Sequence, residues 1–341
     1  MLLNNSDLML VTGATGLVGS HVAEQAVQQG VRVRAIVRAN SDCELLKQWG
    51  VELVTGDLDD AASLRAACRD AAVVVHCAAK VGDWGPTSEY RRINVDGTQS
   101  LLDAALATGV LKRWVQISSL GVYSATDHYG TDETTPPNTQ GIDGYTLTKI
   151  ESDRLICDAV VQRQLPAVVL RPGFIYGPRD RTVMPRLMHR LRTKTFAYLG
   201  NHDKQMNNTF VGNLCEAIRL AIERDDVVGE VFNIRDPRAV SKKEFMDTIC
   251  RAAGYPIPTK VVPLHVARFL SWHLERLWKL LGRQEAPLIN SARIKFLGRN
   301  LDFEIEKANL QLGYQPTIDF TQAMQQTVLW FQNTLSEPAS R

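Results

Sequence analysis

Residues 11–19 are the stretch that most constrains how this chain folds. They read Val-Thr-Gly-Ala-Thr-Gly-Leu-Val-Gly, an apolar run precedes them at residues 8–11, and a helix-like pattern follows at residues 20–29. A strand, a glycine turn and a helix in that order form a pyrophosphate site, because the glycines let the backbone approach closely and the helix N-terminus presents free N–H groups. An ordinary strand-to-helix turn is the alternative.

The first half of the chain alternates strand-like apolar runs with helix-like stretches. We expect strands at residues 8–11, 31–38, 51–54, 73–77, 114–117 and 165–171, and helices at residues 20–29, 41–50, 61–68, 94–108 and 144–163. Repeated strand–helix units predict a Rossmann-like α/β fold, a doubly wound parallel sheet with helices on both faces. Ligands of such sheets bind beyond the C-terminal ends of the strands, so the residues that follow each strand are candidates for the site.

Three strand ends carry residues suited to a dinucleotide. Val37 occupies the end of the second strand, where a fold that prefers NAD usually places a carboxylate, and Arg38 comes directly after it. An arginine suits a 2′-phosphate and so favours NADP (NADPH) over NAD, with a solvated surface arginine as the alternative. Asp57, after the third strand, can accept a hydrogen bond from an adenine amino group, and Ala78 and Ala79, after the fourth, are small enough for the backbone to pass close to a cofactor.

The fifth strand ends in Ser118 and Ser119, and a later helical stretch carries Tyr145 and Lys149. A spacing of four places the tyrosine and the lysine on one helix face, one turn apart. Such a pair by itself is ordinary helix surface. After a nucleotide-binding pattern and two serines at a strand end, it indicates a catalytic site.

With these motifs in order, the sequence resembles the extended short-chain dehydrogenase/reductase superfamily, in its NAD-dependent epimerase/dehydratase group. Within that group it is most similar to the 3β-hydroxysteroid dehydrogenase-like branch, which includes bacterial 2-alkyl-3-oxoalkanoate reductases. The resemblance covers nearly the whole chain and rests on the glycines at 13, 16 and 19, Asp57-Leu58, Asn94 within residues 93–98, Ser118-Ser119, Tyr145 with Lys149, residues 170–178, residues 292–300 and residues 312–316.

The resemblance implies a role for each residue of the candidate site. Tyr145 would be the acid/base, Lys149 would hold the nicotinamide ribose and lower the tyrosine pKa, Ser119 would bind the substrate oxygen, and Asn94 would support the proton path or the local fold. The expected cofactor contacts are Gly13, Thr15, Gly16, Leu17, Val18, Gly19, Arg38, Asp57, Leu58, Ala78, Ala79, Lys80, Ser118, Tyr145, Lys149, Pro172 and Gly173. The expected substrate contacts are Trp84, Ser119, Leu120, Phe174 and Met206, although Trp84 could simply pack.

The composition changes after Gly173, and we expect a smaller, discontinuous α/β substrate lobe there. Residues 174–206 and 236–330 would form the lobe, residues 1–173 and 207–235 the NAD(P)-binding domain, and residues 331–341 a tail. Nucleotide-sugar members of the superfamily carry an asparagine at the position of Phe174, which argues against a sugar-nucleotide substrate here. Residues 264–281, rich in Leu, Phe and Trp with interspersed charges, predict a helix of the lobe core, the wall of an apolar pocket or a peripheral membrane contact.

Composition excludes several classes of function. A net charge of +2 gives no electrostatic footprint for nucleic acid. Six scattered cysteines with no Cys-x-x-Cys pair indicate reduced thiols and no metal site. No apolar run is long enough to span a bilayer, and the first strand begins too early to leave room for a cleavable signal peptide, so we expect a cytoplasmic protein.

The sequence therefore predicts an NADP(H)-dependent oxidoreductase that interconverts a secondary alcohol and a ketone on a hydrophobic small molecule, either sterol-like or a 2-alkyl-3-oxo fatty acid. A nucleotide-sugar epimerase or dehydratase with retained NAD is one alternative, and a non-catalytic NADP-binding sensor or scaffold is another. Residues 94–108 and 145–163 are candidates for a homodimer interface.

Overall fold

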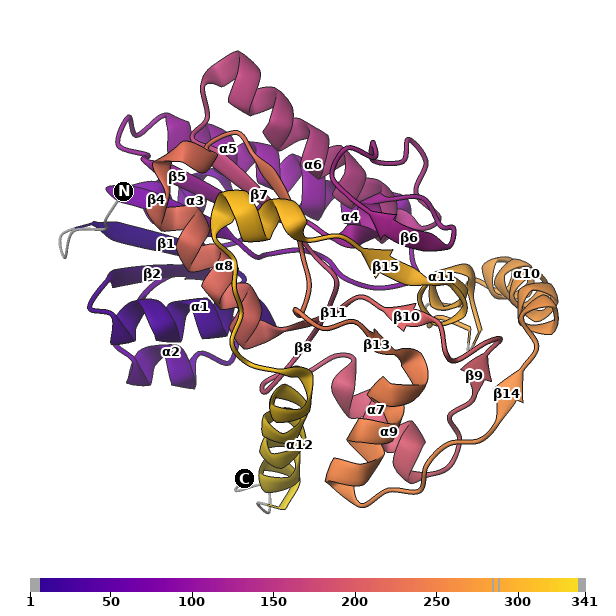
Figure 1. The fold of residues 1–341 in the computed structure, drawn as a ribbon. Coiled ribbons are helices and arrows are strands. Elements are labelled where there is room, and N and C mark those ends of the chain that lie inside the picture. The colour runs from indigo at the N-terminus through magenta and orange to yellow at the C-terminus, as the bar shows by residue number, and fades with distance from the viewer. Residues whose placement is uncertain (1–6, 284, 288, 337–341) are drawn as a thin grey trace.

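The computed structural model describes residues 7–283, 285–287 and 289–336 and is built on a seven-stranded sheet in the order β12-β7-β5-β4-β1-β2-β3 (Figure 1). All of its neighbouring strands pair in parallel. The strands are β1 (Leu8–Thr12), β2 (Arg32–Val37), β3 (Glu52–Thr55), β4 (Ala71–His76), β5 (Arg113–Ile117), β7 (Ala167–Pro172) and β12 (Val231–Ile234). The predicted doubly wound α/β fold is confirmed.

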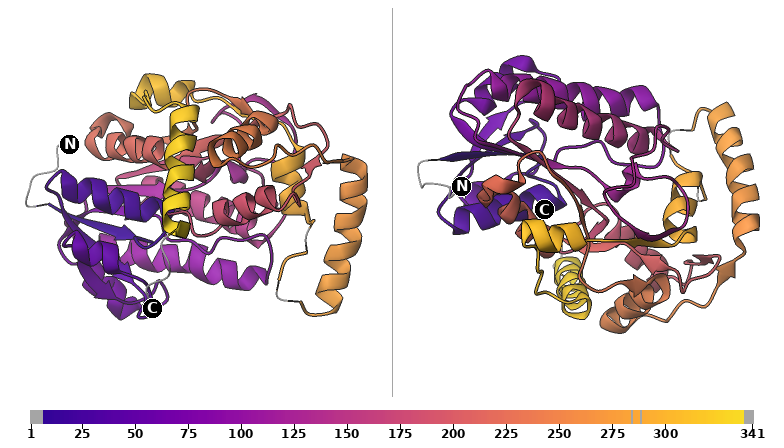
Figure 2. Two further views of the ribbon diagram at one scale, coloured as in Figure 1. Left: turned by 90° about the horizontal axis from the view of Figure 1, so that it is seen from below. Right: turned by 45° about the horizontal axis from the view of Figure 1, so that its top comes forward.

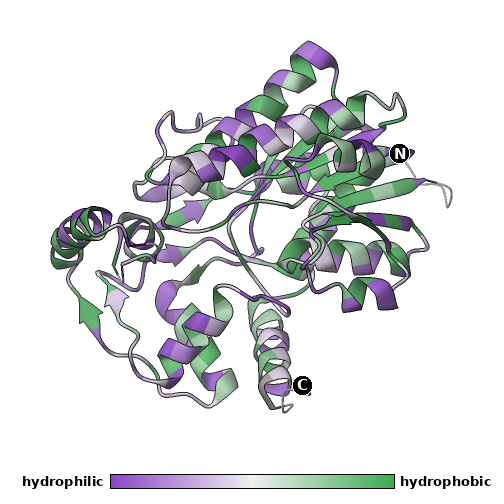
Figure 3. Ribbon diagram, turned by 180° about the vertical axis from the view of Figure 1, so that it is seen from behind, coloured by the Kyte–Doolittle hydropathy of each residue, from purple (hydrophilic) through white to green (hydrophobic). Residues whose placement is uncertain are grey.

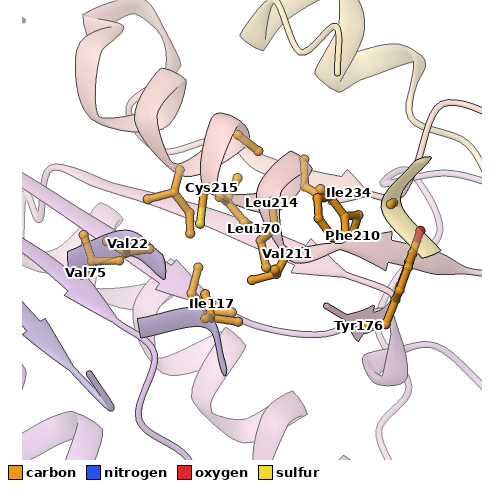
Figure 4. Packing of buried hydrophobic residues seen from close by; sticks show 14 of the residues in the cluster. Val22, Val75, Ile117, Leu170, Tyr176, Phe210, Val211, Leu214, Cys215 and Ile234 are labelled. Atoms are coloured by element: carbon orange, nitrogen blue, oxygen red, sulfur yellow. The ribbon is translucent and has the colours of Figure 1, made fainter. Parts of the chain in front are cut away.

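Helices cover both faces of this sheet, as the views of Figures 1 and 2 show. They are α1 (Leu17–Gln28), α2 (Glu44–Gln48), α3 (Ala61–Cys68), α4 (Thr87–Arg91), α5 (Gly97–Leu106), α6 (Gly144–Arg163) and α8 (Val211–Glu223). Side chains of β1 alternate between the two faces, since Met9 and Val11 pack with α1 and α8 whereas Leu10 packs with α3, α5 and α6. Figure 4 shows part of the first cluster, in which Val22 of α1 and Cys215 of α8 lie over Val75 and Ile117 of the sheet.

The order of the strands locates the candidate site. The chain leaves β1 toward β2 and β3 on one side and then returns to β4 on the other, so the direction of winding reverses between β1 and β4. A crevice forms at such a point beyond the C-terminal ends of the strands. The glycine turn after β1 and the alanines after β4 therefore lie at the same edge of the sheet.

Most of the remaining elements lie at one end of the sheet, beside that edge (Figure 1), whereas the short turn η3 lies at the opposite edge, where Arg113 at the start of β5 donates to Asp225. The strands there are β6 (His128–Thr131), β8 (Phe174–Tyr176), β9 (Tyr198–Leu199), β10 (Gln205–Met206), β11 (Asn208–Phe210), β13 (Val240–Ser241), β14 (Val261–Val262) and β15 (Leu301–Phe303). The helices are α7 (Met184–Arg192), α9 (Lys242–Ala253), α10 (Leu264–Leu280), α11 (Ser291–Gly298) and α12 (Phe320–Ser336), with short turns η2 (Leu120–Val122), η3 (Asp225–Val227) and η4 (Ala308–Leu312). The division into a cofactor domain and a substrate lobe stays a prediction.

Two expectations for this second half are corrected. Helix α10 is not a helix of the lobe core, because only Ala267 and Ser271 of its side chains are buried. Residues 331–336 are not a tail, because α12 extends to Ser336 and Phe331 packs in the main core; residues 337–341 lie outside the described residues. Within the described ranges, none of the helices combines the length and the apolarity needed to cross a bilayer.

Candidate active site

The turn after β1 has a geometry that glycine alone accommodates at two positions. Gly13 adopts a φ of +67°, and a Cβ there would stand 2.8 Å from the backbone nitrogen of Ala78. A Cβ at Gly19 would collide with the carbonyl oxygen of Gly13, against which helix α1 is packed. The turn is therefore tight, and it presses the start of α1 against the end of β4.

The start of α1 is open in a way that fits a diphosphate. Gly16 is the exposed N-cap residue, and no side chain caps the helix. A Cβ added to Gly16 would lie 3.2 Å from the carbonyl oxygen of Gly13. Apart from the chain neighbours of Gly16 and the backbone of its own helix, no other atom of the described residues would lie within 4 Å of it. The N–H groups of the first turn, from Leu17 to Gly19, thus face a cradle that a larger side chain would fill, and the residues present fit the diphosphate of a dinucleotide.

His76 at the end of β4 ties this turn to the neighbouring helix. Its ring nitrogens lie 2.7 Å from the hydroxyl of Thr12 and 2.9 Å from the hydroxyl of Thr98. Since Thr98 donates its own proton to the Asn94 carbonyl oxygen, we infer that it accepts one from Nε2 of His76, and that Thr12 donates to Nδ1. Burial and the charge of Lys149 lower the pKa of His76 to about 3, so the ring is neutral at neutral pH.

Asn94 stands on η1 (Arg92–Asp96), a π-helical turn where we expected a regular α-helix. Its side chain accepts from the backbone N–H of Lys80 at 2.7 Å and donates to the Lys80 carbonyl oxygen and to the hydroxyl of Thr148. These bonds join the loop after β4 to helix α6. They use both amide protons of Asn94, which favours its predicted role in the local fold over the role in a proton path.

Tyr145 and Ser119 face each other across the end of the sheet. Helix α6 begins with a capping box, in which the Asp143 carboxylate accepts from the Thr146 N–H, and this cap sets the position of Tyr145 in the first turn. Ser119 accepts a hydrogen bond from the Gly121 N–H at 2.9 Å and lies within hydrogen-bonding reach of the Tyr145 hydroxyl.

Burial raises the pKa of Tyr145 to about 12, the Ser119 hydrogen bond acts in the opposite direction, and the charge of Asp143 raises the pKa further. Lys149 is not among the groups that shift the pKa of Tyr145, so the predicted lowering of the tyrosine pKa by Lys149 is not observed. The phenol is protonated at neutral pH and is poised to donate its proton.

Lys149 is buried one turn further along α6. Its ammonium donates to the Ile117 carbonyl oxygen at 2.8 Å, which is its one hydrogen bond among the described residues and leaves two N–H groups for a ligand. Burial lowers the pKa of Lys149 to about 8, and the Asp153 carboxylate, one turn on, raises it. Asp153 in turn holds Arg171 of β7, with Nε of Arg171 at 3.0 Å from Oδ2 of Asp153.

Two of the residues predicted to bind the adenosine half lie at the surface. The side chain of Arg38 is exposed, and the structure shows no hydrogen bond or ion pair of its guanidinium with any described residue. The carboxylate of Asp57 accepts from the Leu58 N–H at 2.7 Å, while the Leu58 side chain is buried in the second core cluster. Thr15, Ala78, Ala79 and Lys80 are partly exposed around the glycine turn, and Val18 is buried in α1.

Four other predicted residues are buried or have their backbone N–H already bonded. Ser118 is buried, and its hydroxyl has no partner among the described residues. Gly173, after Pro172, gives its N–H to the Ile234 carbonyl and the Thr209 hydroxyl, so that N–H is not available to a cofactor. Leu120 and Met206 are buried in hydrophobic clusters, which favours packing over substrate contact.

Phe174 and Trp84 border the region between the sheet and the smaller elements. The Phe174 ring packs against Phe245 and Phe296, with centroids 5.8 and 4.9 Å away. The indole N–H of Trp84 donates to the Arg283 carbonyl oxygen at 2.9 Å.

The structure brings Ser119, Tyr145, Lys149 and Asn94 together, whereas sequence reasoning missed His76, Thr98 and Asp153. A histidine inside an otherwise apolar strand was the one available signal for this network.

Comparison with known proteins agrees with this geometry. Residues 9–234 match the model of the NAD dependent epimerase/dehydratase family. The chain is 29% identical to the 2-alkyl-3-oxoalkanoate reductase of Stenotrophomonas maltophilia, covering 93% of this chain and 97% of that protein. It is 28% identical to a 3 beta-hydroxysteroid dehydrogenase/Delta 5-->4-isomerase of Mycobacterium tuberculosis, covering 95% of this chain and 90% of that protein. Among solved structures, the crystal structure of gox2253 superposes with a TM-score of 0.80 at 28% identity, covering 96% of this chain and 98% of that one.

Proposed function

This chain belongs to the NAD-dependent epimerase/dehydratase family and is an oxidoreductase, and from that premise we propose that it reduces the ketone of a hydrophobic molecule to a secondary alcohol with NADPH, and runs the reverse reaction with NADP. The observation that carries the proposal is the convergence of Ser119, Tyr145 and Lys149 at the C-terminal edge of the sheet, beside the glycine turn.

The cofactor, when bound, supplies the hydride. The first turn of α1 would hold its diphosphate, Arg38 its 2′-phosphate and Lys149 its nicotinamide ribose. Ser119 accepts from the Gly121 N–H, and its own O–H, which lies within reach of the Tyr145 hydroxyl, would turn to donate to the carbonyl oxygen of the substrate. Tyr145 then gives its proton to that oxygen. A Tyr145 pKa of about 12 favours the reductive direction, because the phenol starts protonated.

The substrate class rests on the relatives and on Phe174. By their names, one relative acts on a 2-alkyl-3-oxoalkanoate, a keto acid with hydrocarbon chains, and the other on a 3β-hydroxysteroid, so both names indicate largely hydrocarbon molecules. Phe174 stands in an aromatic cluster, where the nucleotide-sugar members carry an asparagine. We therefore favour a sterol-like ketone or a 2-alkyl-3-oxo fatty acid over a sugar nucleotide.

The direct test is to mix the purified protein with NADPH and a panel of such ketones and to follow the absorbance of the reduced cofactor. We expect turnover with at least one apolar ketone and none with a UDP-sugar. Protein that purifies with tightly held NAD and interconverts UDP-sugars would instead establish the epimerase. Binding of NADPH without turnover of any ketone would establish the non-catalytic alternative.

Arg38 decides the choice of cofactor in this proposal. We expect Arg38→Gln to weaken NADPH binding roughly 10- to 100-fold, because a hydrogen bond between charged groups contributes about 1.5–3 kcal/mol, and to leave the Kd of NADH unchanged. Fluorescence titration of both cofactors measures this. Arg32→Gln, a change at the exposed arginine that begins β2, is the matched control. Equal losses for NADPH and NADH would contradict the assignment.

A homodimer stays a proposal. The outer faces of α5 and α6 form a groove, lined by residues such as Gln99, Ile150, Glu151 and Arg154, at the place where the sequence predicts the interface. Sedimentation velocity of the purified protein tests it. A monomer at all concentrations would rule the interface out.

A further inference from the structure

Helix α10 exposes an apolar face that its own chain leaves uncovered. Of the nineteen large hydrophobic side chains that are exposed in the described residues, seven lie at positions 264–281. They are Val266, Phe269, Leu270, Trp272, Leu277, Leu280 and Leu281. Phe269 is 63% exposed and Leu280 is 84% exposed. An isolated exposed leucine is normal on a protein surface, but a row of this length on one helix marks an interaction site.

The opposite face of α10 attaches it to the molecule through a small contact. Ala267 packs with Leu199 and Ile294 in a separate hydrophobic cluster, with Leu264 at its border. The helix stands at the outer edge of the molecule in every view, and its hydropathy colouring is mixed along its length (Figures 2 and 3). Docking on the face away from this cluster therefore requires no rearrangement of the fold.

The charges of this helix favour an anionic partner. Arg268, Arg276 and Lys279 are exposed and interleaved with the apolar residues, and Arg276 stacks on Trp272 with its guanidinium carbon 3.6 Å from the ring centre. Glu275 is the one acid in the helix. It faces inward, where its carboxylate accepts from the Ser291 N–H and the Ser271 hydroxyl. The outward face thus combines aromatic and aliphatic groups with positive charge alone.

This combination selects a lipid surface over a second copy of the chain. In a two-fold dimer the same patch would meet itself, and its cations would face cations. An anionic bilayer instead satisfies both parts of the face, because the apolar side chains enter the boundary between headgroups and acyl chains while arginine and lysine remain at the phosphates.

Two contacts connect α10 to the candidate active site. Arg283 lies three residues beyond the end of α10 and its carbonyl oxygen accepts from Trp84, while Lys279 of α10 lies over the Trp84 ring. In the same loop, the carboxylate of Asp83 accepts from Asn290 and from Arg293. The loop that follows β4 at the cofactor edge is therefore fastened to the segment that follows α10.

We propose that α10 docks this protein on membranes that contain anionic lipids, with the exposed face of residues 266–281 lying in the plane of the interface and the loop around Trp84 near the lipid surface. An apolar substrate then enters from the bilayer without crossing water. The docking itself stands on the helix surface alone and does not depend on which reaction the protein catalyses.

Co-sedimentation with large unilamellar vesicles tests the proposal. We expect the full-length protein to bind vesicles of phosphatidylcholine and phosphatidylglycerol in equal parts, and to bind pure phosphatidylcholine at least tenfold more weakly. The double variant Phe269→Ser/Leu280→Ser is expected to bind the anionic vesicles at least tenfold more weakly, and Arg268→Gln/Arg276→Gln is expected to lose a similar factor and most of the salt dependence.

Leu310→Ser is the matched control, since Leu310 is 74% exposed on η4, outside α10. It should bind like the wild type, and all variants should keep the wild-type melting temperature because the changed side chains are exposed. Failure of the wild type to bind anionic vesicles overturns the proposal, as does binding that the α10 variants retain. A lipid-free dimer that Phe269→Ser/Leu280→Ser cannot form would also overturn it and would assign the face to a second copy.

Discussion

Replacement of Tyr145 by phenylalanine is expected to lower kcat for ketone reduction by roughly 1,000-fold, since a positioned general acid contributes on the order of 10²- to 10⁴-fold to such a step. The variant keeps the ring and loses one hydroxyl, which lies within reach of Ser119. Protein folding and NADPH binding should therefore be unchanged. Steady-state kinetics with a ketone that the wild type accepts, combined with a titration of NADPH, separates the loss of proton transfer from a loss of cofactor binding.

Tyr198→Phe is the matched control for this variant. It also removes a buried tyrosine hydroxyl, but that hydroxyl has no hydrogen-bond partner among the described residues and belongs to β9 in the smaller part of the molecule. Its kcat should equal that of the wild type. A Tyr145→Phe enzyme that retains more than about a tenth of the wild-type kcat would show that another group donates the proton.

The second prediction with a large expected effect concerns the stability of the folded protein. Asp153→Ala is expected to lower the free energy of unfolding by about 3–5 kcal/mol, because it leaves a buried guanidinium without its carboxylate. Asp153 and Arg171 are 2% and 4% exposed, and the carboxylate accepts two hydrogen bonds from the guanidinium. Urea denaturation, followed by circular dichroism, measures the change.

The double variant Asp153→Leu/Arg171→Met provides the control for this prediction. Removing both charges from a buried pair leaves no uncompensated charge, so we expect it to recover most of the stability that Asp153→Ala loses. Two outcomes would contradict the account: a loss of less than about 1 kcal/mol in Asp153→Ala, or a double variant as unstable as the single one.

The sequence was most informative where local patterns determine the structure. The helix expected at residues 61–68 is α3 with the same bounds, and each of the six expected sheet strands lies within two residues at either end of the observed one. Hydrophobic periodicity and glycine punctuation suffice for this, because both act over a few residues. The same argument placed Tyr145 and Lys149 on one face of α6, since a spacing of four is a property of the helix itself.

Features that depend on contacts between distant segments could not be predicted in this way. Asn94, on the π-helical turn, forms hydrogen bonds to Lys80 and Thr148, which lie on other segments. The hydrogen bonds of His76 join β4 to β1 and α5. The partner of Lys149, a carbonyl oxygen at the end of β5, and the pairing of Asp153 with Arg171 follow only from how α6 lies on the sheet.

Helix α10 is a case in which the sequence predicted the helix but not which of its faces is buried. Its composition was compatible with a core helix, a pocket wall or a membrane contact, because an apolar sequence does not state which of its faces another segment will cover. The structure shows that most of this helix is uncovered, which removes the first possibility.

The central claim is that Tyr145 gives its proton to the ketone oxygen, at a site where a bound NADPH would supply the hydride. Mass spectrometry of the alcohol formed with NADPH that carries deuterium at the transferable C4 position tests this claim most directly. The account predicts that wild-type protein places the deuterium on the carbinol carbon and that Tyr145→Phe forms almost none of this product. Alcohol without deuterium, or an equal yield of labelled alcohol from both proteins, would contradict it.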